Sequence, residues 1–220
     1  MRHWLAVTIA LAGCDEVFDL THVEPPGADP CTDTTVAPAT ILLTGQLLDA
    51  ATNAPISGVS VDAQPGGVAS TDASGMFAID VETRGTPLFA SLVIGGTPDH
   101  SPHVVYYQRP FTTNPSDVSN KLLGIAAIDA LYPSGRDPTR GTALISLRDC
   151  SGNGVADARI ELDPSADVSY QGGGAMTNGT GVAYALGVGS GSVVVRGGAA
   201  APFTFAMRSD EMAIVFLVAP

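Results

Sequence analysis

The feature that most constrains the fold is an internal repeat of strand-like segments. From residue 41 onward apolar and polar residues alternate with a period of two, which is typical of half-buried β-strands. The segment LRDCSGNGVADARIELD (147–163) aligns with LLDAATNAPISGVSVDA (47–63), and TNGTGVAYALGV (177–188) aligns with TDASGMFAIDVE (71–82). A repeat of this length indicates two copies of one structural unit. We therefore expect two domains of common ancestry.

A short polar motif that ends in glycine recurs at the same place in both copies. Hydroxyl and carboxylate side chains accept hydrogen bonds from backbone amides in tight turns, and glycine permits positive φ. Asn178 stands in the second copy where the first has an aspartate, and a charge-dependent site would not tolerate that exchange easily. We therefore predict turns rather than a binding site. The turn-forming residues are Thr71, Asp72, Gly75, Thr177 and Gly181.

Composition agrees with a folded all-β chain and excludes one class of partner. Of the 220 residues 45% are apolar, and 25 glycines and 16 prolines favour short strands joined by tight turns. The 22 acidic residues outnumber the 10 basic ones, and Lys121 is the single lysine. Nucleic acid is therefore not an expected partner.

The first copy resembles the carboxypeptidase regulatory-like family in the segments GQLLDAATNAPISGVSVDA (45–63) and STDASGMFAID (70–80). The resemblance covers residues 40–111 well and 141–220 more loosely. It implies a seven-stranded, transthyretin-like sandwich of the immunoglobulin-like kind in each copy, and it implies adhesion, carbohydrate contact or support of a neighbouring protein, with no catalytic residues. The matching residues are Gly45, Asp49, Pro55, Ile56, Gly58, Val59, Val61, Thr71, Asp72, Gly75 and Phe77.

The N-terminus MRHWLAVTIALAGC has the parts of an export signal: a charged start, an apolar run and small residues before a cysteine. Its end resembles a bacterial lipobox, which implies cleavage after residue 13 and lipidation of Cys14. We expect residues 1–13 to be a signal peptide and the acidic, proline-containing segment 14–39 to be a tether. The protein would then be anchored in the bacterial cell envelope, facing the periplasm or the exterior, with inner and outer membrane both open.

Two cysteines, Cys31 and Cys150, remain once Cys14 is assigned to the lipid. In an oxidising compartment a disulfide is their natural use, although cysteines this distant in sequence need not meet in space. Neither has a CxxC partner, so redox or zinc chemistry is the weaker interpretation.

The segment between the copies breaks the β pattern. Asn114 is a suitable N-cap, and Pro115 suits a first helical position. We predict a helix over residues 115–131, packed against one or both sandwiches. The expected organisation is a first sandwich over 40–112, a helical linker over 113–139 and a second sandwich over 140–220.

The best concentration of potential ligands is PDHSPHVVYY (98–107). Asp99, His100 and His103 could share a metal ion if another segment supplied a carboxylate, or they could form a plain polar loop before a strand. Functional contacts in a sandwich lie on loops at its ends, so the loops 95–103 and 165–176 are the candidates.

The favoured function is therefore a non-enzymatic, lipid-anchored binding or scaffolding protein that needs no cofactor, with the membrane, an envelope protein or a glycan as partner. The rival hypothesis is a ligand-delivery protein or metal-assisted enzyme with a site between the two domains. A third is a structural subunit of a larger envelope assembly, which a broad exposed apolar patch would favour.

Overall fold

The structure is a computed structural model that describes residue 31 and residues 36–115, 118–132 and 134–220. The described residues form fourteen strands and one short helix, α1 (Ile125–Asp129), which confirms the predicted all-β fold class. The strands are β1 (Thr40–Asp49), β2 (Ser60–Gln64), β3 (Val68–Ser70), β4 (Met76–Glu82), β5 (Ser91–Ile94), β6 (His103–Tyr107), β7 (Asn120–Leu122), β8 (Gly141–Asp149), β9 (Ile160–Asp163), β10 (Asp167–Tyr170), β11 (Val182–Val188), β12 (Gly191–Gly197), β13 (Phe203–Met207) and β14 (Met212–Ala219).

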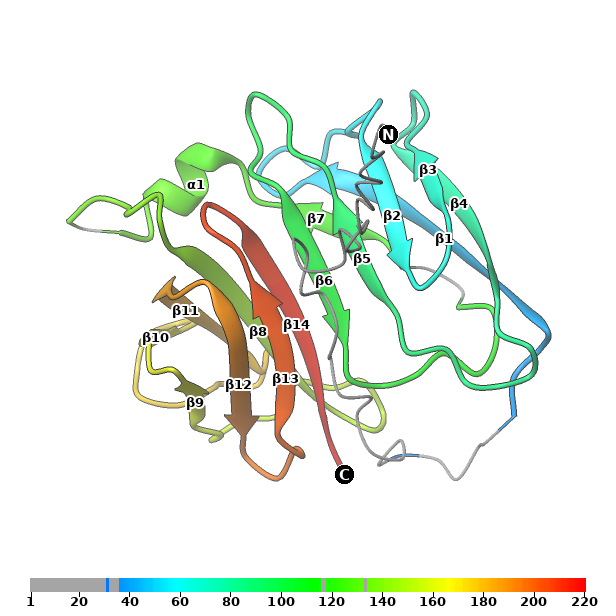
Figure 1. The fold of residues 1–220 in the computed structure, drawn as a ribbon. Helices are drawn as coiled ribbons and strands as arrows, with labels where there is room; N and C mark the ends of the chain where they lie inside the picture. Colours follow the sequence, from blue (N-terminus) through cyan, green and yellow to red (C-terminus); the bar gives the residue numbers. More distant parts are fainter. Residues whose placement is uncertain (1–30, 32–35, 116–117, 133) are drawn as a thin grey trace, which may run out of the picture.

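Two seven-stranded sandwiches follow one another along the chain (Figure 1). The first is built from the strand orders β4-β1-β7 and β6-β5-β2-β3, and the second from β10-β11-β8-β14 and β13-β12-β9. The copies share their central pairing, because β1 and β8 each carry an antiparallel neighbour on one side and a parallel one on the other. A separate cluster of buried apolar side chains fills each sandwich.

The two sandwiches share one sheet, which the sequence analysis did not predict. β14 pairs in parallel with β6 of the first copy and with β8 of the second. The eight-stranded sheet β10-β11-β8-β14-β6-β5-β2-β3 therefore runs through both halves. Val215 on β14 belongs to the second core, whereas its neighbour Ile214 belongs to the first. The C-terminal strand is apolar on both faces because both faces are buried.

The segment predicted to be a helix over residues 115–131 contains the last strand of the first sandwich instead. β7 pairs in parallel with the end of β1, and α1 has only five residues. The side chain of Asn114, expected to cap a helix, accepts a hydrogen bond from the backbone N–H of Leu42 (3.0 Å). Burial of Val118 and Leu122 in the first core outweighs the local helix signals. The first sandwich therefore extends to Leu122, past the predicted boundary at residue 112.

The predicted signal peptide, the lipidation residue Cys14 and most of the predicted tether lie outside the described residues. Among the residues that the structure describes, no helix is long and apolar enough to cross a membrane.

Candidate functional site

The turn residues of the first copy use their polar atoms within the fold. Thr71 Oγ1 accepts a hydrogen bond from the Val59 N–H (3.0 Å), and Asp72 Oδ1 accepts from the amides of Ser74 (2.8 Å) and Met76 (2.9 Å). Hydrogen bonds from the Ser74 side chain and from the Met76 amide lower the pKa of Asp72. These bonds hold the β3–β4 turn, as the sequence predicted.

The second copy repeats this geometry. Thr177 Oγ1 accepts from the Ala158 N–H at 3.0 Å, and Asn178 Oδ1 accepts from the Thr180 N–H at 2.9 Å. An amide oxygen thus replaces the carboxylate of the first copy and keeps the bond from the amide two residues later. The motif forms a turn in both sandwiches.

The two turn glycines occupy positions that exclude a side chain. Gly75 has φ +75° and Gly181 has φ +66°. A Cβ on Gly75 would lie 2.6 Å from the carbonyl oxygen of Leu47, and one on Gly181 would lie 2.1 Å from the carbonyl oxygen of Leu147. Both glycines are therefore required by close backbone approach as well as by φ.

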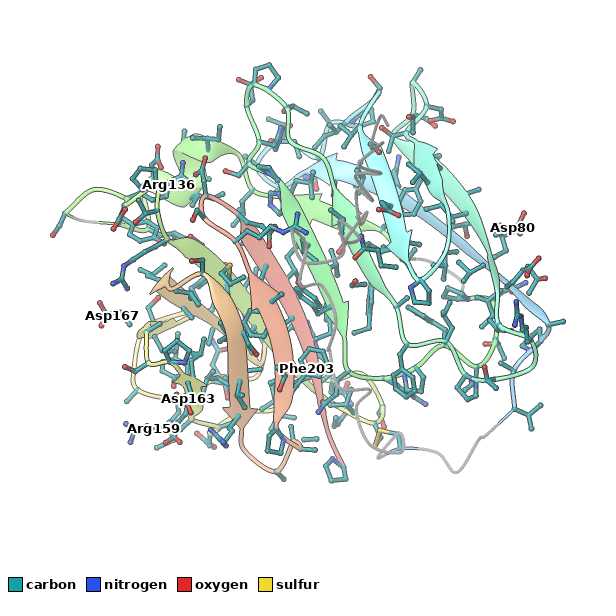
Figure 2. The ribbon with its side chains drawn as sticks, in the orientation of Figure 1. Asp80, Arg136, Arg159, Asp163, Asp167 and Phe203 are labelled. Carbon is teal, nitrogen blue, oxygen red and sulfur yellow. A yellow bond between two sulfur atoms is a disulfide. The ribbon has the colours of Figure 1, made fainter. Side chains whose placement is uncertain are left out.

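Cys31 and Cys150 form the predicted disulfide, with their Cα atoms 5.4 Å apart across 119 residues of sequence. It connects the segment before β1 to the turn after β8, and it is drawn as a yellow bond in Figure 2. The second sandwich is thereby tied covalently to the chain that leads into the first.

His100, one of the three predicted metal ligands, is a buried hydrogen-bonding residue. Its Nε2 lies 3.0 Å from Asp49 Oδ2, and its Nδ1 lies 3.0 Å from Thr97 Oγ1. A neutral imidazole satisfies both contacts if Nε2–H donates to the carboxylate and Nδ1 accepts from the hydroxyl. Hydrogen bonds from Thr52 and then from His100 hold the pKa of Asp49 at about 2, so the carboxylate stays ionised. The group joins the end of β1 to the β5–β6 loop.

His103 is fully buried at the start of β6. Its Nδ1–H donates to the carbonyl oxygen of Ser101 (2.7 Å), while its Nε2 has no partner among the described residues. Burial lowers the pKa of His103 to about 4, so the imidazole is neutral near pH 7.

Asp99, the third predicted ligand, contributes backbone contacts. Its N–H donates to Thr97 Oγ1 (3.3 Å), and its carbonyl oxygen accepts from the Ile125 N–H (2.8 Å) at the start of α1. No three His, Cys, Asp or Glu side chains within the described part of the chain are grouped to hold a metal ion. The loop thus differs from the predicted metal site, because both nitrogens of His100 already have partners.

Two features of the structure could not be predicted from the sequence. One is the contact between Asp49 and His100, which are 51 residues apart. The other is Glu211, a buried acid directly before β14 whose Oε1 has no partner among the described residues. Burial raises the pKa of Glu211 to about 7, although Arg208 opposes the shift. No sequence pattern marks either residue.

A cavity of about 590 Å³ lies between the segment that follows α1 and the second sandwich. The guanidinium of Arg140 donates to the Gly187 carbonyl oxygen (2.8 Å), and Tyr132 Oη accepts from the Gly187 N–H (3.1 Å). Hydrogen bonds from Thr139 lower the pKa of Asp137, so this lining residue stays ionised. The cavity includes the first part of the predicted loop 165–176 and none of the histidines. Its lining residues are Tyr132, Ser134, Gly135, Asp137, Arg140, Ser165, Ala166, Asp167, Leu186 and Gly187.

No protein-family model and no curated protein sequence matches the chain. Among solved structures it is similar to the TIE protein of Bacillus anthracis, with 12% identity over 82% of this chain and 34% of that one and a TM-score of 0.27. A streptococcal ancillary pilin matches with 12% identity over 86% of this chain and 64% of that one, with a TM-score of 0.26. The shaft pilin SpaA of Lactobacillus rhamnosus GG matches with 10% identity over 85% and 98%, with a TM-score of 0.24. The chain thus spans about a third of the first protein and just under two thirds of the second, and likenesses at these TM-scores carry no argument about function.

Proposed function

We propose that the chain is a non-enzymatic binding or scaffolding protein of the bacterial cell envelope, held there by a lipid on Cys14. The observation that carries the proposal is that, among the described residues, the side chains best suited to chemistry make hydrogen bonds that stabilise the fold. His100 bonds both Asp49 and Thr97 and so joins two segments, and Asp72 closes a turn. No nucleophile is left beside a free base in this group.

Location outside the cytoplasm is supported by the Cys31–Cys150 disulfide. Disulfides persist in oxidising compartments and are rare in the cytosol. A scaffolding role is supported by the shared sheet, because β14 is hydrogen-bonded to strands of both copies. The protein would hold two sandwich ends in a fixed relation.

The lipid anchor is tested by expressing the full chain in a Gram-negative host and separating membranes from soluble protein. Cys14→Ser should move the protein from the membrane fraction to the soluble fraction. Cys31→Ser is the matched control and should stay with the membrane. A Cys14→Ser variant that remains membrane-bound would contradict the anchor.

The binding role is tested by cross-linking the anchored protein in intact envelopes and identifying what it holds. An envelope protein or glycan recovered at constant stoichiometry is the expected result. Recovery of lipid alone would contradict the binding role.

The cavity favours a second candidate, delivery or storage of a small polar ligand. Tyr132 offers an aromatic ring, while Asp137, Asp167 and Arg140 offer charged hydrogen-bonding groups, a combination that suits a sugar. Saturation-transfer NMR with N-acetylglucosamine and glucose tests this directly. Arg140→Ala should abolish the signal, whereas Arg159→Ala, an exposed arginine outside the cavity, should not.

A further inference from the structure

The two sandwiches differ in where one strand pairs, and the difference leaves an edge open. β3 and β10 hold the same place in the repeat, yet β3 pairs with β2, whereas β10 pairs with β11. β4, the counterpart of β11, pairs only with β1 among the described strands. The first copy therefore lacks the strand that covers this edge in the second.

The hydrogen-bonding groups on the open edge follow from the register of β4. Just before the strand, the Gly75 carbonyl oxygen accepts from the Leu47 N–H, and just after it the Thr83 N–H donates to the chain leading into β1. In an antiparallel pair such bonds occur at alternate residues, so the odd-numbered residues of β4 face β1. The backbone N–H and C=O groups of Ala78 and Asp80 therefore point outward.

The second copy shows how this edge is filled. When the turn glycines are aligned, Tyr184 and Leu186 of β11 correspond to Ala78 and Asp80 of β4. β10 pairs with both of them, with Ser169 opposite Tyr184. The same backbone positions are thus paired with a strand in the second sandwich and are not paired with one in the first.

The open edge is acidic. Asp80 and Glu82 are exposed on the solvent face of β4, and Figure 2 shows Asp80 pointing away from the molecule at its outer side. These charges disfavour pairing of β4 with β4 of a second copy, because like charges would lie opposite one another. They complement lysine or arginine side chains on the same face of an incoming strand.

The sandwich side of the edge is apolar. Phe77, Ile79 and Val81, on the face of β4 opposite Asp80, are buried in the first core. In the second copy Val168 and Tyr170 of β10 point to this side and pack against the core. A strand added to β4 would therefore place apolar residues here and basic residues on the opposite face.

The other edge left by the strand exchange, that of β9, is occupied at both of its ends. The outward N–H of Ile160 donates to the Tyr170 hydroxyl (3.0 Å), and Pro164, which follows the strand, has no N–H to offer. Among the described strands, β4 combines outward backbone groups at Ala78 and Asp80 with an acidic solvent face.

We propose that the edge of β4 binds an extended segment of another protein in which basic and apolar residues alternate, by addition of that segment to the sheet as a further strand. The inference rests on the proposed binding function and names its partner class.

The test uses the full chain and an acetylated nine-residue peptide in which lysine and valine alternate. Hydrogen exchange measured by NMR should slow at least tenfold at the Ala78 and Asp80 amides when the peptide is present. The Asp80→Lys/Glu82→Lys variant should bind the peptide at least tenfold more weakly and should gain affinity for the corresponding glutamate–valine peptide. Glu161→Lys/Asp163→Lys makes the same charge change on β9 and should keep the affinity within about threefold.

Three results would overturn the proposal: unchanged exchange at Ala78 and Asp80, equal weakening by the two charge-reversal pairs, or undiminished binding of the peptide after N-methylation of alternate backbone amides. The outcome is separable from that of the envelope cross-linking. A cross-linked protein partner whose capture is unaffected by Asp80→Lys/Glu82→Lys would refute the β4 site and leave the binding function standing. Addition of the peptide at β4 with no envelope partner recovered would support the β4 site and refute the proposed binding function.

Discussion

At the scale of single residues, two buried ionisable groups act in opposite directions on stability. The pKa of Glu211 is raised by burial to about 7 from 4.5, so between these pH values the folded chain retains a proton that the unfolded chain releases. This contribution makes stability fall as pH rises. The pKa of His103 is lowered by burial to about 4 from 6.5, so the unfolded chain binds the proton first and stability falls as pH drops. The two effects oppose each other between pH 4.5 and 6.5.

Single substitutions should reveal how each group makes the free energy of unfolding depend on pH. Relative to the wild type, Glu211→Gln should make the free energy of unfolding rise by about 2–3 kcal/mol from pH 4.5 to 6.5. His103→Asn, which keeps a donor for the Ser101 carbonyl oxygen, should make it fall by a similar amount. Urea denaturation across this pH range measures both slopes. Variant curves that run parallel to the wild type would contradict the assignment.

Substitutions of glycines in turns can separate the energetic cost of positive φ from the cost of a close contact. Gly173→Ala meets only the cost of positive φ, because φ is +82° and no atom lies within 4 Å of the added Cβ, so about 1 kcal/mol should be lost. Gly181→Ala adds the 2.1 Å contact with the Leu147 carbonyl oxygen and should cost at least about 2 kcal/mol. Gly179→Ala, in open space without positive φ, is the neutral control. Thermal unfolding of the three variants gives the order, and equal losses at 173 and 181 would argue against the contact.

At the scale of secondary-structure elements, the features that could be predicted are those that the local sequence determines. Alternation marked the strands, and the repeated threonine and glycine marked both turns. The 115–131 helix failed because its signals are local, whereas the chain there is fixed by pairing of β7 with β1, about 70 residues away. The exchange of β3 and β10 between sheets was equally hidden, because both are short strands with no partner preference in their composition.

The residues of the candidate site divide in the same way, into those fixed by the local sequence and those fixed by contacts with distant segments. The Cys31–Cys150 bond was predictable from cysteine number and compartment, and the turn role of Asp72 from its neighbours. Of the two alternatives for the histidine loop, the polar loop before a strand agrees with the structure and the metal site does not, but the partner of His100 at the end of β1 could not be predicted. Contacts between distant segments decide whether a histidine is a ligand or a structural residue.

The strand that replaced the predicted helix should contribute measurably to stability. Leu122 of β7 is fully buried, so Leu122→Ala should lower the free energy of unfolding by about 2–5 kcal/mol. Leu42→Ala on β1 of the same sheet makes the same change at a position with 36% exposure, and it should cost less than about 1 kcal/mol. Chemical denaturation compares the two. Similar small losses would indicate that β7 does not belong to the first core.

At the scale of the whole molecule, one covalent link and one shared sheet join the copies. The disulfide spans 119 residues, so in the chain-entropy model it limits the unfolded state strongly. Replacing both cysteines by serine should lower the free energy of unfolding by about 2–5 kcal/mol without changing the fold. Denaturant titration with circular dichroism checks both statements. Dithiothreitol should reproduce the loss in the wild type and have no effect on the double variant.

The shared sheet should make the two sandwiches unfold together. Ile214 and Val215 are neighbours on β14 yet belong to different cores, so neither core can open fully without breaking a strand that the other needs. Phe205→Ala lies in the second core and should weaken the most protected amides of β5, in the first sandwich, by the same few kcal/mol as those of β12. Ile79→Ala in the first core should do the converse. Native-state hydrogen exchange resolves both sandwiches at once, and loss of protection confined to the mutated sandwich would mean that pairing of β6 with β14 does not couple them.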